Sequence, residues 1–333
     1  MAIEVISNAL VLAGAYNLSG VANAVTVTDG ADIKDATVLS SSGRVRTAGF
    51  RSATARVEGY REATADTGLA AGLALTDVPF SVAHANTENA IAYTFKALWA
   101  DMVPLGGAVG EMARMSLTAE SSSGAVVRVT TGPITDVTVD KEGPTFTRVS
   151  GSFITDGFRV GHTVTWVGFT ESENLTAVAI TALTATVMTA SAATLKDEAA
   201  GDTVTATMTP LVGATYRPLI RGILGTHQTA AATSSASTKF QLGAVTAAQY
   251  LYGALHVYSA SGTNPTLDVT LQSDADASAG SETVRLTFAQ KTAAGYEWAS
   301  PIVGAIADTY WRASWTVAGT NPSFAFAVVF GIL

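Results

Sequence analysis

The sequence predicts a mainly β protein, for three reasons. Threonine, valine and alanine alternate along many short segments, for example over residues 24–28, 137–139 and 203–205. Glycine, serine, asparagine or aspartate stands at the breaks between these segments, as is usual at strand ends. Only one segment, residues 88–102, has apolar residues at helical spacing. The alternation predicts strands with one buried face and one solvent-exposed face.

Length and composition predict two or three globular domains in the 333-residue chain. Hydrophobic residues make up 48% and charged residues 14%, so the chain can bury large cores and is not expected to be disordered. No apolar run reaches the roughly 18 residues that a membrane-spanning helix needs. The formal net charge of −8 argues against a surface that coats nucleic acid. The first residues carry no basic leader, so we expect a mature chain made in the cytoplasm.

The first unusual segment, residues 44–61, is rich in arginine. A loop-like run at residues 40–43 precedes it, and residues 51–58 alternate like a strand. Its five arginines are Arg44, Arg46, Arg51, Arg56 and Arg61. Arginine suits ion pairs at interfaces, because its planar guanidinium binds carboxylates through two hydrogen bonds. The alternative is a strand face that is simply solvated.

Residues 88–102 form the segment with helical spacing. Its apolar residues fall on one stripe at Ile91, Phe95, Leu98, Trp99 and Met102. Asn86 or Thr87 provides an N-cap, and Pro104 ends the pattern. We therefore expect one amphipathic helix that packs against a sheet.

Residues 125–213 are expected to form a separate small β unit. Short alternating segments there are separated by Asp156-Gly157 and by residues 171–174. Their length and spacing predict a barrel-like module of five or six strands.

The last hundred residues contain a short sequence motif that occurs twice. Gly262-Thr263-Asn264-Pro265 recurs as Gly319-Thr320-Asn321-Pro322, each time between an aromatic-rich segment and an alternating one. Asparagine-proline after glycine-threonine predicts a turn, so we expect two similar hairpins in a β-sandwich. The tryptophans expected to fill its core are Trp298, Trp311 and Trp315.

The sequence does not indicate an enzyme, a cofactor or a metal centre. It has no cysteine, which excludes disulfides and thiolate chemistry, and its four histidines do not have the spacing of a metal pair. Asp274-Ala275-Asp276 lacks the glycine and the distal glutamate of an EF-hand loop, which leaves a calcium site as a minor alternative. His256 alternates within a strand and is expected to be packed or on the surface.

Several loose patterns together resemble the major tail (tube) proteins of long-tailed bacteriophages. They are residues 17–20 before a strand, residues 31–37 before a long loop, residues 44–49 (RVRTAG) at its end, the strand 51–59, the helix expected after it, residues 107–120, and residues 216–225 (YRPLIRGILG) as a closing strand. The resemblance implies a tail-tube-like β-sandwich or barrel over residues 1–124 with a closing strand at 214–228. The small β-domain 125–213 is then an insertion, and residues 229–333 form a C-terminal β-sandwich that projects outward.

The resemblance also implies self-assembly, with six copies per ring and stacked rings forming a tube for DNA. Loop residues expected to contact neighbouring subunits are Asp35, Arg44, Arg46, Phe50 and Arg51. Apolar residues of an N-terminal arm expected to do so are Ile3, Val5, Ile6, Leu10 and Leu12. The helix residues expected at the subunit joint are Ile91, Phe95, Leu98 and Trp99.

The implied partners are further copies of this chain, with a tape measure and a tail terminator as other tail proteins. DNA only passes through, no membrane insertion is expected, and the location is the virion tail after assembly in the host cytoplasm. Two alternatives stay open: a head-decoration or fibre protein, and a β-sandwich adhesin that binds sugar. The adhesin would use exposed aromatic residues at Trp298, Tyr310 and Trp311.

Overall fold

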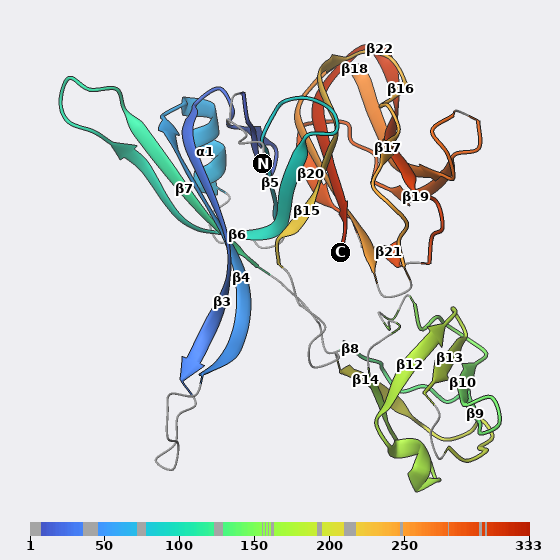
Figure 1. Cartoon of the computed structure of the whole chain (residues 1–333). Helices are drawn as coiled ribbons and strands as arrows, with labels where there is room; N and C mark the ends of the chain where they lie inside the picture. Colours follow the sequence, from blue (N-terminus) through green and yellow to red (C-terminus); the bar gives the residue numbers. More distant parts are fainter. Residues whose placement is uncertain are drawn as a thin grey trace, which may run out of the picture. The chain divides into compact units, whose positions relative to one another are not determined.

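The protein is mainly β, with one α-helix and one 3₁₀ turn in the described residues of a computed structural model (Figure 1). The structure describes residues 8–35, 46–71, 78–122, 129–154, 156, 158, 160, 163–191, 195–209, 218–246, 249–278, 280–299, 302–303 and 305–333. The chain divides into two compact units. The first comprises residues 1–124 and 217–333, and the second comprises residues 125–216.

Fifteen strands in the described part of the first unit form one branched sheet. Its N-terminal strands are β1 (Leu10–Ala13), β2 (Tyr16–Asn17), β3 (Ala22–Asp35), β4 (Arg46–Tyr60), β5 (Val78–Ala83), β6 (Ile91–Gly106) and β7 (Arg114–Ser121). Its C-terminal strands are β15 (Ile220–Ala231), β16 (Ser235–Ala236), β17 (Phe240–Gln241), β18 (Tyr250–Asp274), β19 (Thr283–Thr287), β20 (Gly295–Trp298), β21 (Ile302–Val303) and β22 (Tyr310–Ile332).

Strand β6 is the branch point of this sheet. One path runs in the order β19-β18-β22-β15-β6-β5-β1-β2, and the second runs β3-β4-β7-β6. The first half of β6 pairs with β5 and β15, whereas residues from Ala97 to Gly106 pair with β7. A register shift between Trp99 and Asp101 bends the strand where it leaves β5. The sheet thus joins residues 1–124 to the C-terminal strands within one unit.

The prediction of a helix over residues 88–102 is wrong, because this segment forms strand β6. Alternate residues of the strand are buried from Phe95 through Ala97 to Trp99, while Tyr93 is exposed. Alanine at small core positions hides this two-residue period, and the larger side chains by chance also fall on a helical stripe. Ile91 and Leu98 are half-buried strand residues.

The helix lies earlier, as α1 (Ala63–Ala71), directly after β4. Its alanines favour helix, and the Glu62 carboxylate accepts a hydrogen bond from the Ala65 backbone N–H at 2.6 Å. Backbone hydrogen bonds, that from Ala65 first, lower the pKa of Glu62. Leu69 is buried against the sheet. Within the described residues, no helix has the length and apolar character to cross a membrane.

Strand β1 is buried on both faces. Val11 and Ala13 belong to a core that β4, β5, β6, β7 and α1 enclose. Leu10 and Leu12 point the other way, into a smaller cluster with Leu224 of β15 and strand β22. Such two-sided burial requires the continuous apolar run that the sequence has at residues 10–13.

The repeated Gly-Thr-Asn-Pro motifs do not form turns, so the two predicted hairpins are wrong. Strands β18 and β22 pair with each other along nearly their whole length, and the two motifs face each other with Thr263 opposite Thr320. Asn264 and Asn321 both have φ near +50°. Gly262 and Gly319 also have positive φ, and a Cβ on either would lie within 2.7 Å of the opposite motif's asparagine carbonyl oxygen. The motifs are therefore paired bulges that bend one long ribbon.

The bent ribbon encloses the C-terminal core with its own two halves. Large apolar side chains from both halves pack there with Leu286 and Phe288. Fully buried members from β22 include Trp311, Phe324, Phe326 and Phe330. Trp315 also belongs to this core, whereas Trp298 is half-buried. Strands β16 and β17 pair with β22, and β19, β20 and β21 pair with β18.

A close backbone approach at Gly59 leads to a testable prediction. A Cβ on Gly59 would lie 2.3 Å from the Val21 carbonyl oxygen, so Gly59→Ala is expected to lower the free energy of unfolding by about 1–3 kcal/mol. Urea denaturation measures the change. Gly30→Ala on the paired strand β3 is the matched control, because no atom lies within 4 Å of the added Cβ. Equal stability of the two variants would contradict this reading of the β3–β4 ladder.

The second unit is a small closed barrel. Its elements are β8 (Val129–Thr130), β9 (Val137–Asp140), β10 (Thr145–Arg148), β11 (Thr163–Val167), the 3₁₀ turn η1 (Ser172–Leu175), β12 (Val178–Leu183), β13 (Val187–Ala190) and β14 (Thr205–Thr209). The sheet order is β8-β14-β11-β12-β13-β10-β9. Bridges from Ile134 to Val204 and from Val139 to Glu198 connect β9 back to the segment before β14, which closes the sheet. Its core includes the stacked rings of Phe146 and Trp166, 4.9 Å apart.

Candidate assembly surface

Strands β3, β4, β7 and β6 form a four-stranded sheet with two open edges. Residues of β4 from Thr54 to Tyr60 pair with β7, and β3 pairs with β4 along residues 22–35. Among the strands that the structure describes, none pairs with the other edge of β3, nor with the second edge of β6 beyond Ala97. Unpaired N–H and C=O groups along such edges are templates for a further strand.

The two faces of this sheet differ in character. The face toward α1 is apolar and includes Ala55, Val57, Leu117 and Trp99. The opposite face is mostly polar but also holds Leu98, opposite Glu120, and Val103, opposite Ser116. Its polar or aromatic members are Thr26, Thr28, Thr54, Arg56, Glu58, Tyr60, Asp101, Arg114, Ser116, Thr118 and Glu120. The Arg56 guanidinium pairs with the Glu58 carboxylate at 2.9 Å. The named charged residues of this face are two arginines and three carboxylates. We call it the polar face.

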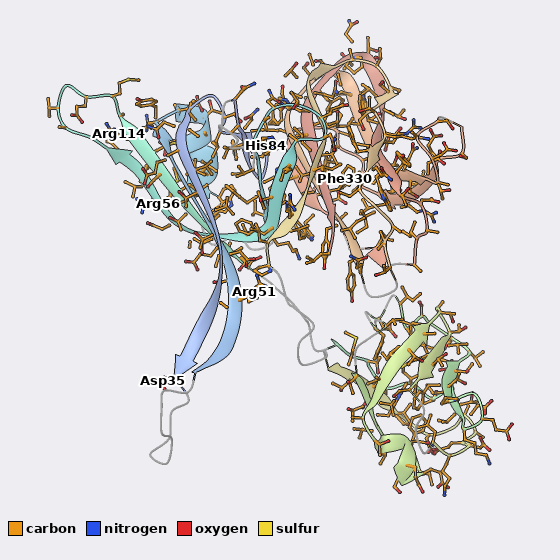
Figure 2. All side chains as sticks on the ribbon, viewed as in Figure 1. Asp35, Arg51, Arg56, His84, Arg114 and Phe330 are labelled. Carbon is orange, nitrogen blue, oxygen red and sulfur yellow. The ribbon has the colours of Figure 1, made fainter. Side chains whose placement is uncertain are left out.

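The β3–β4 hairpin carries the loop residues predicted to contact other subunits. Asp35 ends β3 opposite Arg46, at the far end of the ribbon (Figure 2). Arg51 instead pairs within the hairpin, with its guanidinium 2.5 Å from the Asp29 carboxylate. The backbone of Phe50 lies in β4, and Arg44 lies outside the described residues. Inter-subunit contact by these residues stays a prediction.

The hairpin that joins β6 to β7 exposes several large apolar side chains. Leu105 is 67% exposed, Met112 is 65% exposed, and Val103 and Val109 are exposed as well. Gly107 and Gly110, both at positive φ, shape the turn between the strands. We call Val103, Leu105, Val109 and Met112 the apolar fringe. Large apolar groups gathered on one exposed hairpin are typical of a surface that a partner covers.

The predicted N-terminal arm is partly wrong. Leu10 and Leu12 are each 1% exposed and lie in the chain's own core, because β1 is held between β2 and β5. They are not available to a neighbouring subunit. Ile3, Val5 and Ile6 lie outside the described residues.

The predicted aromatic binding surface is not formed as expected. Trp311 is fully buried, and its indole N–H donates to the Gly243 carbonyl at 2.7 Å. Tyr310 is half-buried at the start of β22. Trp298 lies 6.2 Å from Tyr252 between ring centroids, at an interplanar angle of 55°. The tilted rings do not form the flat platform on which a sugar stacks.

His256 lies in a buried polar network between β18 and β5. Its Nδ1 is 2.7 Å from the Gly14 carbonyl oxygen, so this nitrogen carries the proton and donates. Its Nε2 then accepts from the Ser81 hydroxyl at 2.8 Å. Burial lowers the pKa of His256 to about 4, although the bond to Gly14 opposes this shift. The ring is enclosed and neutral, so the pair of serine and histidine is structural.

No group of three or more acidic or histidine side chains in the described part of the chain is arranged to hold a metal ion. A groove beside β15 is lined by Glu88, Gln228 and Trp315. Glu88 accepts hydrogen bonds from Thr226 and Thr238, and the Trp315 indole donates to the Thr233 carbonyl. These polar groups are thus engaged in hydrogen bonds within the protein that stabilise the walls of the groove.

The sequence reasoning missed both the apolar fringe and the open edge of β6. Pro104 as the end of a predicted helix leaves Leu105 in a loop, and it hides that Val103 and Leu105 belong to a strand. A signal was present, because Val103, Leu105, Val109 and Met112 are large apolar residues in a segment otherwise typical of a turn.

The structure therefore defines a mainly β protein whose described strands leave two sheet edges open, one on β3 and one on β6. No family model and no curated protein matches the chain. The solved structures similar to it include the following two. One is the virion of a native gene transfer agent particle, at 18% identity over 35% of this chain and 92% of that chain, with a TM-score of 0.26. The other is the SPP1 Dit (gp 19.1) protein, described as a paradigm of the hub adsorption apparatus in phages that infect Gram-positive hosts. It has 9% identity over 98% of this chain and 100% of that chain, with a TM-score of 0.27. At these TM-scores neither likeness carries an argument.

Proposed function

We propose that this chain is a structural subunit of a bacteriophage particle that assembles with copies of itself into rings, and that stacked rings form the tail tube. The observation that carries the proposal is the four-stranded sheet β3-β4-β7-β6 with an open edge on each side. The resemblance of the sequence to tail-tube proteins supports the same assignment. We expect the protein to have no enzymatic activity and no cofactor.

Ring formation would satisfy both open edges at once. The β3 edge of one subunit pairs with the β6 edge of the next, so that each contact joins two different surfaces. Such head-to-tail contacts close into a ring when the rotation between subunits is right. The result is a continuous barrel without edges, and the apolar fringe is covered by the neighbouring subunit.

The polar face of the sheet would then line the bore. Its threonines, its serine and its two arginines among three carboxylates offer DNA no cluster of lysine or arginine to which phosphates could bind. The face toward α1 is occupied by the chain's own core. DNA would therefore pass without being retained.

Finer points of the proposal rest on the resemblance. They are a ring of six copies, stacking through the loop around Arg44 and through the first residues of the chain, and partnership with a tape measure and a tail terminator. Assembly in the host cytoplasm and location in the virion tail belong to the same proposal.

The direct test is electron microscopy of the purified chain at high concentration, together with light scattering to measure its mass. Rings or tubes in which the β3 and β6 edges of adjacent subunits meet support the proposal. A monomer at every concentration, or an assembly that leaves both edges solvent-exposed, overturns it.

Charge placed on the apolar fringe is expected to prevent this assembly. In the triple variant Leu105→Asp, Val109→Asp and Met112→Asp, three carboxylates would have to be desolvated at the joint, at several kcal/mol in total. We expect monomers with an unchanged circular dichroism spectrum, because the three side chains are exposed in the single chain.

The control places two such aspartates in the inserted barrel. Val149→Asp and Val167→Asp replace valines that are similarly exposed on the second unit. This variant is expected to assemble like the wild type. Assembly of the fringe variant at wild-type concentrations would show that the hairpin is not at the joint.

A further inference from the structure

Four charged side chains meet inside the C-terminal part of the first unit. The side chain of Lys239 is 6% exposed, that of Asp274 is 2% exposed and that of Glu282 is 12% exposed, while Arg312 is slightly more open. Lys239 immediately precedes β17, Asp274 ends β18, and Glu282 immediately precedes β19. The cluster therefore joins segments on both sides of β22, which pairs with β17 and with β18.

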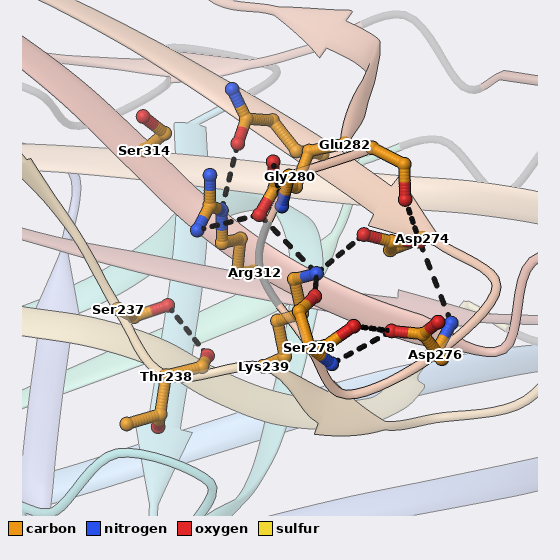
Figure 3. A network of polar contacts seen from close by, with 12 residues as sticks. Ser237, Thr238, Lys239, Asp274, Asp276, Ser278, Gly280, Glu282, Arg312 and Ser314 are labelled. Carbon is orange, nitrogen blue, oxygen red and sulfur yellow. Dashed lines mark hydrogen bonds and ion pairs between the residues drawn. The ribbon is translucent and has the colours of Figure 1, made fainter.

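The contacts converge on the lysine ammonium, as Figure 3 shows. Lys239 Nζ donates to Asp274 Oδ2 and to the Ser278 carbonyl oxygen, and it lies 3.2 Å from Glu282 Oε1. The same Glu282 oxygen lies 3.0 Å from the Arg312 guanidinium. One amine thus has a carboxyl group as its direct neighbour and a second carboxylate beside it.

The two oxygens of Asp274 are held differently. Oδ2 is the oxygen in contact with the lysine, whereas Oδ1 accepts a hydrogen bond from the Ser281 hydroxyl at 2.8 Å. The Asp276 backbone N–H also points to Oδ1, at 3.5 Å. Donors fixed on one oxygen would stabilise negative charge that develops there.

From this geometry we propose that Lys239 and Asp274 join in an intramolecular isopeptide bond, with Glu282 as the catalytic proton carrier. The class of modification is a side-chain amide formed with loss of one water molecule. It needs no oxidant, metal or external group, because amine, carboxyl and base all belong to this chain. Nothing in the assembly proposal requires it, so the two can fail separately.

The reaction balances as follows. A proton first moves from Nζ to Oδ2, which gives a neutral amine and a carboxylic acid. The Nζ lone pair then attacks Cγ, and the π electrons of the Cγ–Oδ1 bond move to Oδ1, where Ser281 and Asp276 donate. Glu282 takes the second proton from Nζ and passes it to the Oδ2 hydroxyl. The Cγ–Oδ1 double bond re-forms, the Cγ–Oδ2 bond breaks and water leaves.

The resting charges explain why the reaction needs a catalyst. Burial lowers the pKa of Lys239, but hydrogen bonds to Asp274 and Glu282 outweigh it and place the pKa above its ordinary value. The Lys239 ammonium, and after it Ser281, holds the pKa of Asp274 well below its usual range. The reactive neutral pair is therefore a minor state. Glu282 favours amide formation by removing the second proton from Nζ. Because the product amide is buried, water has little access to hydrolyse it.

The test is the mass of the purified, denatured full-length chain. We expect a mass one water molecule below that of the sequence, and a proteolytic peptide in which the segment holding Lys239 is linked to the segment holding Asp274. The full sequence mass overturns the proposal and leaves an ion pair only. A lost water without the linked peptide, as a succinimide at Asp274 would give, also overturns it.

Variants separate the reacting groups from their surroundings. Lys239→Met and Asp274→Ala are each expected to restore the full mass of their sequences. Glu282→Gln is expected to slow the water loss by about 100-fold or more, the usual contribution of a general acid–base group. An unchanged rate in that variant removes Glu282 from the mechanism.

The matched control is Lys291→Met. Lys291 pairs with Glu297 at 2.8 Å and is also largely buried, but the structure shows no second carboxylate with it among the described residues. This variant is expected to keep the lost water. Because the wild-type mass is measured on the protein as it exists, variants that fail to fold do not decide the question.

Discussion

Replacing Phe330 by alanine is expected to lower the free energy of unfolding by about 3–5 kcal/mol. The ring is fully buried in the C-terminal core (Figure 2), on a strand that lies between β15 and β18. Backbone neighbours on both sides hold the surrounding strands in place, so the cavity cannot collapse. Urea denaturation followed by circular dichroism measures the change.

Val284→Ala on β19 is the control for this variant. Val284 is an exposed edge residue, so its truncation should change the free energy of unfolding by less than about 0.5 kcal/mol. A loss below about 1 kcal/mol for Phe330→Ala would mean that the two halves of the bent ribbon do not share one core.

Acidification is expected to destabilise the fold through His256, by about 3 kcal/mol between neutral pH and pH 4. The folded-state pKa lies near 4, below the ordinary value of 6.5. The unfolded chain therefore takes up a proton first as the pH falls. Stability from this group is complete above pH 6.5, is lost between 6.5 and about 4, and does not change further below that.

The measurement compares urea midpoints of the wild type and His256→Gln across this pH range. Between pH 4 and 6.5 the free energy of unfolding should depend less steeply on pH in the variant, by the amount that one proton contributes. Carboxylates elsewhere titrate equally in both proteins and do not affect the comparison. Ser81→Ala is the control, since it removes the hydroxyl that donates to Nε2 but keeps the titrating ring. It should be less stable throughout and retain the wild-type slope. Identical slopes in His256→Gln and the wild type would show that the ring titrates normally.

The mainly β class was predictable because threonine and valine alternation is a local signal. Val137–Asp140 forms a strand where the pattern indicated one, and residues 24–28 lie within β3. The barrel-like character of the inserted unit also followed from the spacing of short segments. Which strands pair could not be read in this way, since the pairing between β6 and β15 joins residues far apart in sequence.

The errors have physical causes that particular residues illustrate. Trp99 fits a helical stripe and a strand face equally well, and only the sheet decides between them. Asn264 at positive φ is what a turn requires, yet a facing copy of the same motif makes it a bulge. Residues 10–13 have no polar side because their strand is buried on both faces, and the same apolar run also fits an arm that contacts a neighbouring subunit.

The candidate surface was only partly predictable. The arginine-bearing hairpin was found from its composition, and the resemblance supplied a role for it. The open edge of β6 depends on where β5 begins, at Val78 opposite Ala97, and no residue pattern marks that point.

The way the inserted barrel is attached has a practical consequence. The chain leaves the sheet after Ser121, beside Ala97, and returns at Ile220, beside Thr94 on the same strand. The barrel's own entry and exit are adjacent too, because Val129 pairs with Met208. The two ends of the insertion are thus close together in each unit, so a short glycine-serine tether, or a foreign cargo whose termini lie close together, should be able to replace it. A particle built from this subunit would display that cargo once per copy.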